Sequence, residues 1–226
     1  EYAEFWEPEL AAGNDVLHLT LSSGISGSYN SAVIAAQSLA EKYPERTVCV
    51  VDSLAASSGY GLLMDYLADL RDGGATFEEA CAWAEEHKLN LNHWFFVSDL
   101  DCLKRGGRVS ATSALIATAL KICPVMNVDY QGKLIPREKI RTKKKAITAL
   151  VDRMMEHVEG GAGYTGKCSI SQSACREDAE EVARLIGERI PALKDKIVIN
   201  NIGTVIGSHT GPGTVALFFM GDKRVD

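Results

Sequence analysis

The chain lacks the features that mark several specialised classes of protein. No apolar run approaches the roughly 18 residues of a membrane-spanning helix. The composition is neither low-complexity nor disordered, because 46% of the 226 residues are hydrophobic and 24% are charged. Basic residues are not in excess, since 24 Lys and Arg stand against 30 Asp and Glu and leave a net charge of -6. We therefore expect no transmembrane segment and no general affinity for nucleic acid.

The sequence also lacks paired cysteines. Its six cysteines occur singly, and the two closest, Cys168 and Cys175, are seven positions apart. Without a CxxC pair, free thiols in a reducing cytoplasm are expected rather than a disulfide framework. No second histidine stands at ligand spacing from His209, so no metal site is expected. No signal peptide is visible, which also favours a cytoplasmic location.

What is present begins with a repeated strand-then-helix pattern in residues 1–91. Apolar runs that are too continuous for one-sided strands predict two buried parallel strands, each followed by a helix. Thr76 and Glu79 form the sequence pattern of a capping box that starts a further helix. Right-handed crossovers would join these elements into a parallel three-layer α/β domain. The expected strands are 15–23 and 46–53, and the expected helices are about 28–43, 56–70 and 76–87.

Residues 92–226 have a different pattern, which predicts a two-layer α+β domain with a mixed sheet. A turn at Gln131–Gly132 would divide residues 125–140 into an antiparallel hairpin. A polar glycine loop is expected at 103–110, ending at Ser110, which is positioned to cap the next helix. The other expected strands are 93–99, 167–173, 196–202 and 215–220, and the expected helices are about 111–122, 144–158 and 177–189.

The strongest local motif is residues 22–29 (SSGISGSY), between the end of a buried strand and the start of a helix. Ligands bind at this edge of open α/β sheets, and a helix N-terminus offers unpaired N–H groups to an anion such as a carboxylate or phosphate. One alternative is a serine-capped helix after a tight turn. Another is a serine hydrolase with Ser23 or Ser26 as nucleophile and His209 as base, although Ser28 stands where a nucleophile elbow has its closing glycine.

Other segments carry further candidate anion contacts. Asp52 and Ser53 end the second strand, where they either adjoin the first glycine loop or cap the next helix. Arg105 and Arg108 flank two glycines, and guanidinium groups pair with carboxylate or phosphate through two hydrogen bonds. A surface loop with positive-φ glycines is the alternative there. His209 lies in a predicted turn of small residues (SHTGPG), where it can donate to a bound anion.

A basic patch spans residues 133–145 (KLIPREKIRTKKK). It holds seven basic residues and one acid, a local charge of +6, so the rest of the chain carries -12. A concentrated basic patch on an acidic protein suits docking to an acidic partner or steering of phosphate. A solvated hairpin and helix start is the alternative. No aromatic residues interleave with the basic ones, so nucleic acid is not favoured as the partner.

Taken in order, these motifs resemble those of the DegV family, the fatty-acid-binding proteins that serve bacterial fatty acid kinase. The resemblance covers nearly the whole chain, from about Tyr2 to Phe219. It rests on several separate segments, which makes it far more specific than a single glycine loop. The segments are 22–32 (SSGISGSYNSA), 50–61 (VVDSLAASSGYG), 103–126 (LKRGGRVSATSALIATALKICPVM), 132–146 (GKLIPREKIRTKKKA) and 203–219 (GTVIGSHTGPGTVALFF).

The resemblance implies that the ligand is a long-chain fatty acid and that no other cofactor is bound. It implies that the hydroxyls of Ser22 and Ser23, the backbone of Gly24 and the ring of His209 hold the carboxylate. The helix after the glycine loop, with Ile116, is implied as lining for the acyl tail.

The family's basic positions are implied to lie near the mouth of the site. Arg108 is expected at the ligand, and Arg105 and Arg141 are expected to meet a separate ATP-dependent fatty acid kinase subunit that makes the acyl phosphate. The chain itself is then a lipid-binding delivery subunit without catalytic residues. A serine hydrolase acting on acyl esters and a regulatory interaction module using residues 133–145 remain as alternatives.

The sequence departs from the family pattern at its start. A typical member begins with a strand carrying an aspartate–serine motif, followed by a threonine–serine loop that supplies another hydroxyl to the carboxylate. The sequence starts too late to contain either, so an N-terminal truncation is expected.

Overall fold

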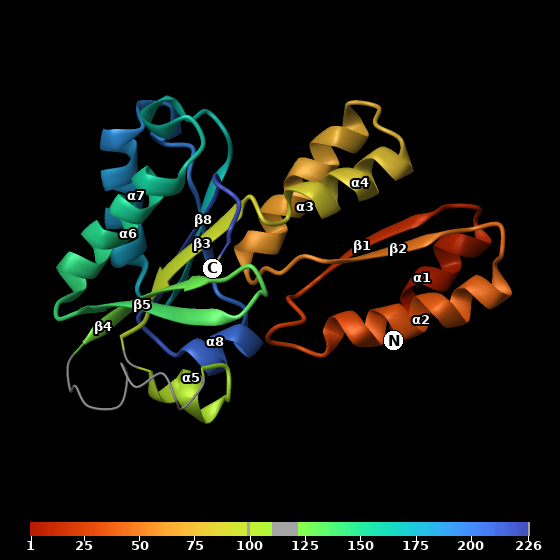
Figure 1. Ribbon diagram of the computed structural model, residues 1–226, viewed down its shortest axis with the longest axis horizontal. Coiled ribbons are helices and arrows are strands. Elements are labelled where there is room, and N and C mark those ends of the chain that lie inside the picture. Colours follow the sequence, from red (N-terminus) through yellow and green to blue (C-terminus); the bar gives the residue numbers. More distant parts are fainter. Residues whose placement is uncertain (99, 110–121, 226) are drawn as a thin grey trace.

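Two sheets organise the described part of the chain, a two-stranded sheet and a six-stranded one (Figure 1). The computed structural model describes residues 1–98, 100–109 and 122–225. The smaller sheet is built from the first part of the chain, and the larger one from residues that begin at Leu91. The fold is therefore α/β with a two-domain layout, as the sequence predicts. The domain limits at residues 91 and 92 stay a prediction.

The smaller sheet has helices on both faces. Alternation of side chains along its strands divides the core, since Val48 and Val50 contact one helical layer while Cys49 and Val51 contact the other. Apolar residues at successive strand positions thus require two covering layers. The strands β1 (Val16–Thr20) and β2 (Val48–Asp52) are parallel, with α1 (Tyr2–Ala11) and α2 (Ser28–Lys42) on one face and α3 (Ser58–Asp72) and α4 (Phe77–His87) on the other (Figure 1).

The larger sheet is mixed, with strand order β5-β4-β3-β8-β6-β7. Its neighbouring strands are antiparallel except β6 and β7, which are parallel. Helices α6 (Lys143–His157) and α7 (Arg176–Arg189) cover one face (Figure 1). The strands are β3 (Leu91–Phe96), β4 (Cys123–Val128), β5 (Leu134–Ile140), β6 (Cys168–Ser173), β7 (Val198–Asn201) and β8 (Thr214–Met220). Two short 3₁₀ turns, Gly161–Gly163 and Pro191–Leu193, complete this part of the chain.

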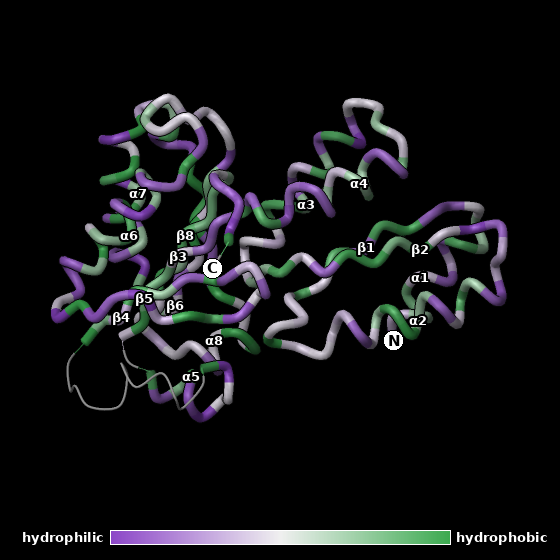
Figure 2. Tube along the Cα trace, in the orientation of Figure 1, coloured by the Kyte–Doolittle hydropathy of each residue, from purple (hydrophilic) through white to green (hydrophobic). Residues whose placement is uncertain are grey.

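The opposite face of the larger sheet meets elements from both halves of the chain. Helix α3 contacts β3, β6 and β8 as well as β1, and two short helices, α5 (Asp101–Arg105) and α8 (Thr204–Thr210), pack against each other. Along β3 the side chains alternate: Trp94 stacks on His157 of α6, and its neighbours His93 and Phe95 face the other way. Strands β1, β2 and β8 are predominantly hydrophobic along their length (Figure 2).

Several local predictions are confirmed. The capping box of α4 is present, with Glu79 N donating to Thr76 Oγ1 at 3.2 Å and Thr76 N donating to the Glu79 carboxylate at 2.8 Å. The β4–β5 hairpin turns where expected, and Gly132 adopts a φ of +72° there. Asp52 lies beside the serine–glycine loop and accepts a hydrogen bond from Ser23 N at 3.1 Å. Residues local in sequence account for most of these features.

Two local predictions are wrong, and one helix was not predicted at all. That helix is α1, residues 2–11, which forms despite Pro8 inside it. Residues 103–105, expected to begin a glycine loop at 103–110, are helical and form the last turn of α5. The helix ends at Arg105 because two glycines follow. His209 lies in the last turn of α8, not in a turn after a strand.

The expected helix over residues 111–122 falls almost entirely outside the described residues, and Ser110 lies outside them too. None of the helices in the described parts of the chain combines the length and apolar character needed to cross a membrane.

Candidate functional site

A cavity of about 130 Å³ lies against the face of the larger sheet that α6 and α7 leave uncovered. Strands β3 and β8 form one wall, and their register places His93 opposite Phe218 and Phe95 opposite Ala216. The other walls come from α5, α8, the serine–glycine loop and the residues before α3. Most of the lining is apolar and includes Leu21, Leu103, Ile202, Val205 and Ile206. Such walls suit a hydrocarbon chain rather than a polar metabolite.

Polar groups gather where the serine–glycine loop approaches the glycine turn after α5. Arg108 lines the cavity, and its Nε donates to the Ile25 carbonyl at 3.2 Å while its Nη1 donates to the Gly106 carbonyl at 2.6 Å. Ser26 follows Ile25 and lines the same cavity, with its hydroxyl 2.8 Å from that of Ser28. Arg108 thus links two of the loops that the sequence singles out as anion contacts.

His209 is brought to the same place by a close approach between α8 and the turn after α5. A Cβ atom at Gly106 would lie 2.2 Å from His209 Nδ1, closer than side chains approach. Position 106 must therefore be glycine if the imidazole is to lie against this turn. Because both His209 and Arg108 line the cavity, the structure brings these two predicted site residues together.

Two lining side chains were missed by reasoning from sequence motifs. Thr210 Oγ1 and both ring nitrogens of His93 are buried without a hydrogen-bond partner among the described residues. Burial lowers the pKa of His93 well below its usual value near 6.5, and the positive charge of Arg224 acts in the same direction. The ring is therefore neutral at neutral pH. The available signal for His93 was strand alternation, which puts it on the same face as Phe95.

Ser22, Ser23 and Gly24 are not among the residues that line this cavity. Ser22 is fully buried, and its hydroxyl donates to the Gly132 carbonyl at 2.8 Å and accepts from Gly24 N at 3.1 Å. Ser23 is exposed, and Gly24 borders a separate surface hollow that it shares with Arg108. These contacts join the serine–glycine loop to the β4–β5 hairpin. The role of the three residues at a carboxylate stays a prediction.

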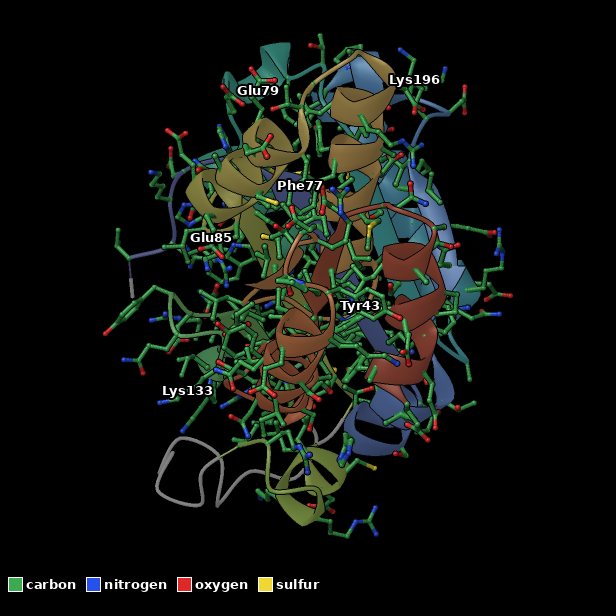
Figure 3. All side chains as sticks on the ribbon, turned by 90° about the vertical axis from the view of Figure 1, so that its right-hand side faces the viewer. Tyr43, Phe77, Glu79, Glu85, Lys133 and Lys196 are labelled. Atoms are coloured by element: carbon green, nitrogen blue, oxygen red, sulfur yellow. The ribbon has the colours of Figure 1, made fainter. Side chains whose placement is uncertain are left out.

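The predicted docking residues lie in different elements. Arg105 ends α5 and its guanidinium donates to Cys102 Sγ at 3.3 Å. Arg141 is exposed in the link between β5 and α6. The basic patch of residues 133–145 covers β5 and the first turn of α6, and Lys133 projects outward from the hairpin (Figure 3). Ile116, the predicted tail contact, lies outside the described residues.

The described hydrogen bonds do not assemble a serine nucleophile with a base. Ser26 Oγ pairs with Ser28 Oγ and accepts from Ser28 N at 3.2 Å, and no described bond joins Ser23 or Ser26 to His209. In the same parts of the chain, no three His, Cys, Asp or Glu side chains come together as metal ligands do.

Comparison with known proteins agrees with the architecture. A family model described as "Uncharacterised protein, DegV family" matches residues 1–222. The chain belongs to the DegV family. A DegV domain-containing protein of Clostridium perfringens is 42% identical over 223 residues, which cover 99% of this chain and 75% of that protein. A DegV domain-containing protein of Lactococcus lactis is 34% identical over the same length, with the same coverage.

Several solved structures share this fold, and their descriptions name a fatty acid or fatty acid binding. A DegV protein of Ruminococcus gnavus, refined with vaccenic acid, has a TM-score of 0.85 at 30% identity and covers 96% of this chain and 75% of its own. The Fatty Acid Kinase (Fak) B3 protein of Streptococcus pneumoniae, loaded with linoleic acid, has a TM-score of 0.85 at 26% identity, with 98% and 75% covered. A Thermotoga maritima protein described as revealing fatty acid binding function has a TM-score of 0.74 at 30% identity, with 98% and 74% covered.

Proposed function

We propose that this chain binds a long-chain fatty acid in the cavity beside β3 and β8 and delivers it to a separate ATP-dependent fatty acid kinase subunit. The observation that carries the proposal is the cavity, which combines apolar walls with Arg108 and His209 at the junction of α5 and α8. The DegV relatives that hold vaccenic and linoleic acid support the class of ligand.

The acyl chain supplies most of the binding free energy. Each methylene removed from water contributes about 0.8 kcal/mol. Phe95, Leu103, Ala216 and Phe218 offer the chain an apolar surface. The same walls would leave a polar metabolite without hydrogen-bond partners, which is unfavourable in a buried site.

The carboxylate belongs, in this proposal, among Arg108, His209 and Thr210. Hydrogen bonds from a guanidinium or imidazole to an ionised carboxylate are shorter and stronger than those between neutral groups. Thr210 Oγ1 is buried without a partner among the described residues, so a ligand oxygen would satisfy it. Ser22, Ser23 and Gly24 would act here by holding the loop that positions Ser26 and Ile25.

Delivery to a kinase accounts for the basic patch. The Streptococcus pneumoniae relative supports such a partner by its name, Fatty Acid Kinase (Fak) B3 protein. The kinase would carry out the phosphoryl transfer, and this chain would shield the acyl group and present the carboxylate. Arg105, Arg141 and residues 133–145 supply positive charge for docking.

Native mass spectrometry of freshly purified protein, followed by solvent extraction, tests the proposal. We expect a bound fatty acid, and a His209→Ala variant should load at least about tenfold less, because a charge-assisted hydrogen bond is lost. His87→Ala is the matched control, because His87 stacks on Trp83 of α4 and is not among the residues that line the cavity. A protein that arrives empty and also refuses added fatty acid would contradict the proposal.

A further inference from the structure

One wall of the cavity carries a polar side chain that the proposed function leaves unexplained. His93 is only 2% exposed and lines the cavity from the third position of β3. Neither Nδ1 nor Nε2 has a hydrogen-bond partner among the described residues. Native proteins leave very few buried polar atoms unpaired, so a histidine with both nitrogens unpaired indicates a partner from outside the chain.

The surroundings of His93 hold its ring in place. Its edge meets the ring of Phe218, with the ring centroids 5.2 Å apart. On another side α3 approaches so closely that a Cβ atom at Gly59 would lie 2.2 Å from Nε2. A ring confined in this way can receive a ligand from the cavity but cannot turn away to find another partner.

His93 lies well away from the place proposed for the carboxylate. Along β8, Phe218 faces His93, and Thr214 lies four residues earlier, which corresponds to about 13 Å of strand. Thr214 Oγ1 donates to the carbonyls of Thr210 and Gly211, so it marks the end of the cavity where α8 and His209 lie. A fatty acid held at that end would therefore pass His93 part-way along its acyl chain.

The chemistry of the ring selects the group it can bind. The buried imidazole is neutral, so one nitrogen donates and the other accepts. A second carboxylate beside a neutral ring and apolar walls would remain poorly solvated. A hydroxyl can donate or accept, so it can pair with whichever nitrogen faces it.

We propose that His93 forms a second polar subsite, which binds a hydroxyl group carried part-way along the acyl chain. The inference rests on the proposed function, since it takes a fatty acid as the ligand. It predicts that the protein prefers a mid-chain hydroxy fatty acid to the unsubstituted acid of the same length.

Competitive loading tests the subsite. The full chain is offered equal amounts of octadecanoic acid and one monohydroxyoctadecanoic acid, and the bound lipids are extracted and quantified. The competition is repeated with a series of positional isomers of the hydroxy acid, which moves the hydroxyl along the chain. At least one mid-chain isomer should be preferred by roughly fivefold, as one neutral hydrogen bond allows. In His93→Phe the ratio of bound hydroxy acid to bound octadecanoic acid should fall to about one. His18→Phe is the matched control, because His18 packs on Tyr2 and Trp6 and should keep the preference.

The outcomes separate the two proposals. If octadecanoic acid loads and no isomer is preferred, or if His93→Phe keeps the preference, the subsite is refuted while fatty acid binding stands. If neither kind of lipid loads, both proposals fail. Should His93→Phe not fold, ¹⁵N NMR of the wild-type ring replaces it. The His93 nitrogen signals should shift with the preferred isomer and not with octadecanoic acid, and equal shifts with both would overturn the subsite.

Discussion

At the scale of single residues, Gly106 is a position that the candidate site restricts to glycine. The imidazole of His209 occupies the space that a side chain at position 106 would need, since a Cβ atom there would lie 2.2 Å from Nδ1. Gly106 therefore acts on the ligand only through His209 and is a positioning residue. The Gly106 carbonyl also accepts a hydrogen bond from Arg108 Nη1.

Gly106→Ala should therefore displace His209 and weaken fatty acid binding by about tenfold, the loss expected for one charge-assisted hydrogen bond. Titration calorimetry with one fatty acid measures the change. Gly61→Ala is the control, because Gly61 lies inside α3 with nothing within 4 Å of its Cβ position, and alanine there should stabilise the helix by about 0.5–1 kcal/mol. Equal affinity of Gly106→Ala and wild type would show that His209 does not hold the ligand.

The buried histidines make stability depend on pH. Burial holds the pKa of His93 well below its usual value near 6.5 and lowers that of His18 as well. The unfolded chain then binds protons more readily than the folded one, so the free energy of unfolding should fall as the pH drops below about 6.5. Each such histidine adds a slope of up to about 1.4 kcal/mol per pH unit.

Urea unfolding of the ligand-free protein between about pH 7.5 and pH 5 measures this slope. His93→Phe should flatten it, because phenylalanine has no proton to gain in the unfolded state. His18→Phe should flatten it less, since His18 is less deeply buried than His93. If the slope of His93→Phe equals that of the wild type, the His93 ring of the wild type is protonated equally in the folded and unfolded states.

At the scale of elements, α8 is the wall best able to move. The helix has seven residues and none of them is buried, and Val205 is 73% exposed although it lines the cavity. The cavity encloses about 130 Å³, below the roughly 300–1,000 Å³ of most ligand sites. A long acyl chain needs more room than this, and we expect α8, which has no buried residue, to be the wall that moves.

Hydrogen exchange measured by mass spectrometry should show this. We expect the amides of α8 to exchange more slowly once a fatty acid is bound, because the acyl chain gives Val205 and Ile206 an apolar surface to pack on. Helix α6 serves as the internal control, since it packs on the other face of the sheet through buried residues such as Leu150 and Met154. Identical exchange of α8 with and without ligand would place the moving wall elsewhere.

Local sequence patterns predicted most elements and only part of the site. The capping box of Thr76 and Glu79 and the hairpin turn at Gly132 depend on residues close in sequence, so they could be predicted. The α8 helix could not, because Gly207 and β-branched residues give it low helix propensity. The hydrogen bond from Ser22 to Gly132 joins residues 110 positions apart, and no local pattern reports it.

The dependence on contacts that local patterns do not show also explains why His93 and Thr210 were missed at the cavity. Arg108 and His209 stand out because each lies in a glycine-rich motif. His93 lies in an apolar strand and resembles an ordinary core residue until both its nitrogens are seen to be unpaired. Thr210 gains its significance from the packing of α8 against α5, which involves residues about a hundred positions apart.

At the scale of the whole molecule, a shared hydrophobic core and an uneven distribution of charge matter. Leu19 and Val51 of the smaller sheet share one hydrophobic cluster with residues of the larger sheet such as Leu217, so the two halves are joined through a common core. Charge is distributed unevenly as well, with +6 on residues 133–145 and -12 on the rest of the chain. A positive patch of this size speeds encounter with an acidic partner more than it tightens the final complex.

Reversing charge within the patch tests whether it is the docking surface. The double change Lys144→Glu and Lys145→Glu should slow acyl phosphate formation by the partner kinase about tenfold at low salt. The difference in rate between this variant and the wild type should narrow as salt screens the exposed charges. Fatty acid loading is measured in parallel, so that an empty protein is not mistaken for slow turnover.

The matched control is Lys194→Glu with Lys196→Glu, which changes net charge equally on an exposed segment that lies far from Lys133 (Figure 3). Equal slowing by both double variants would assign the effect to net charge, and no slowing by either would remove the patch from the docking surface.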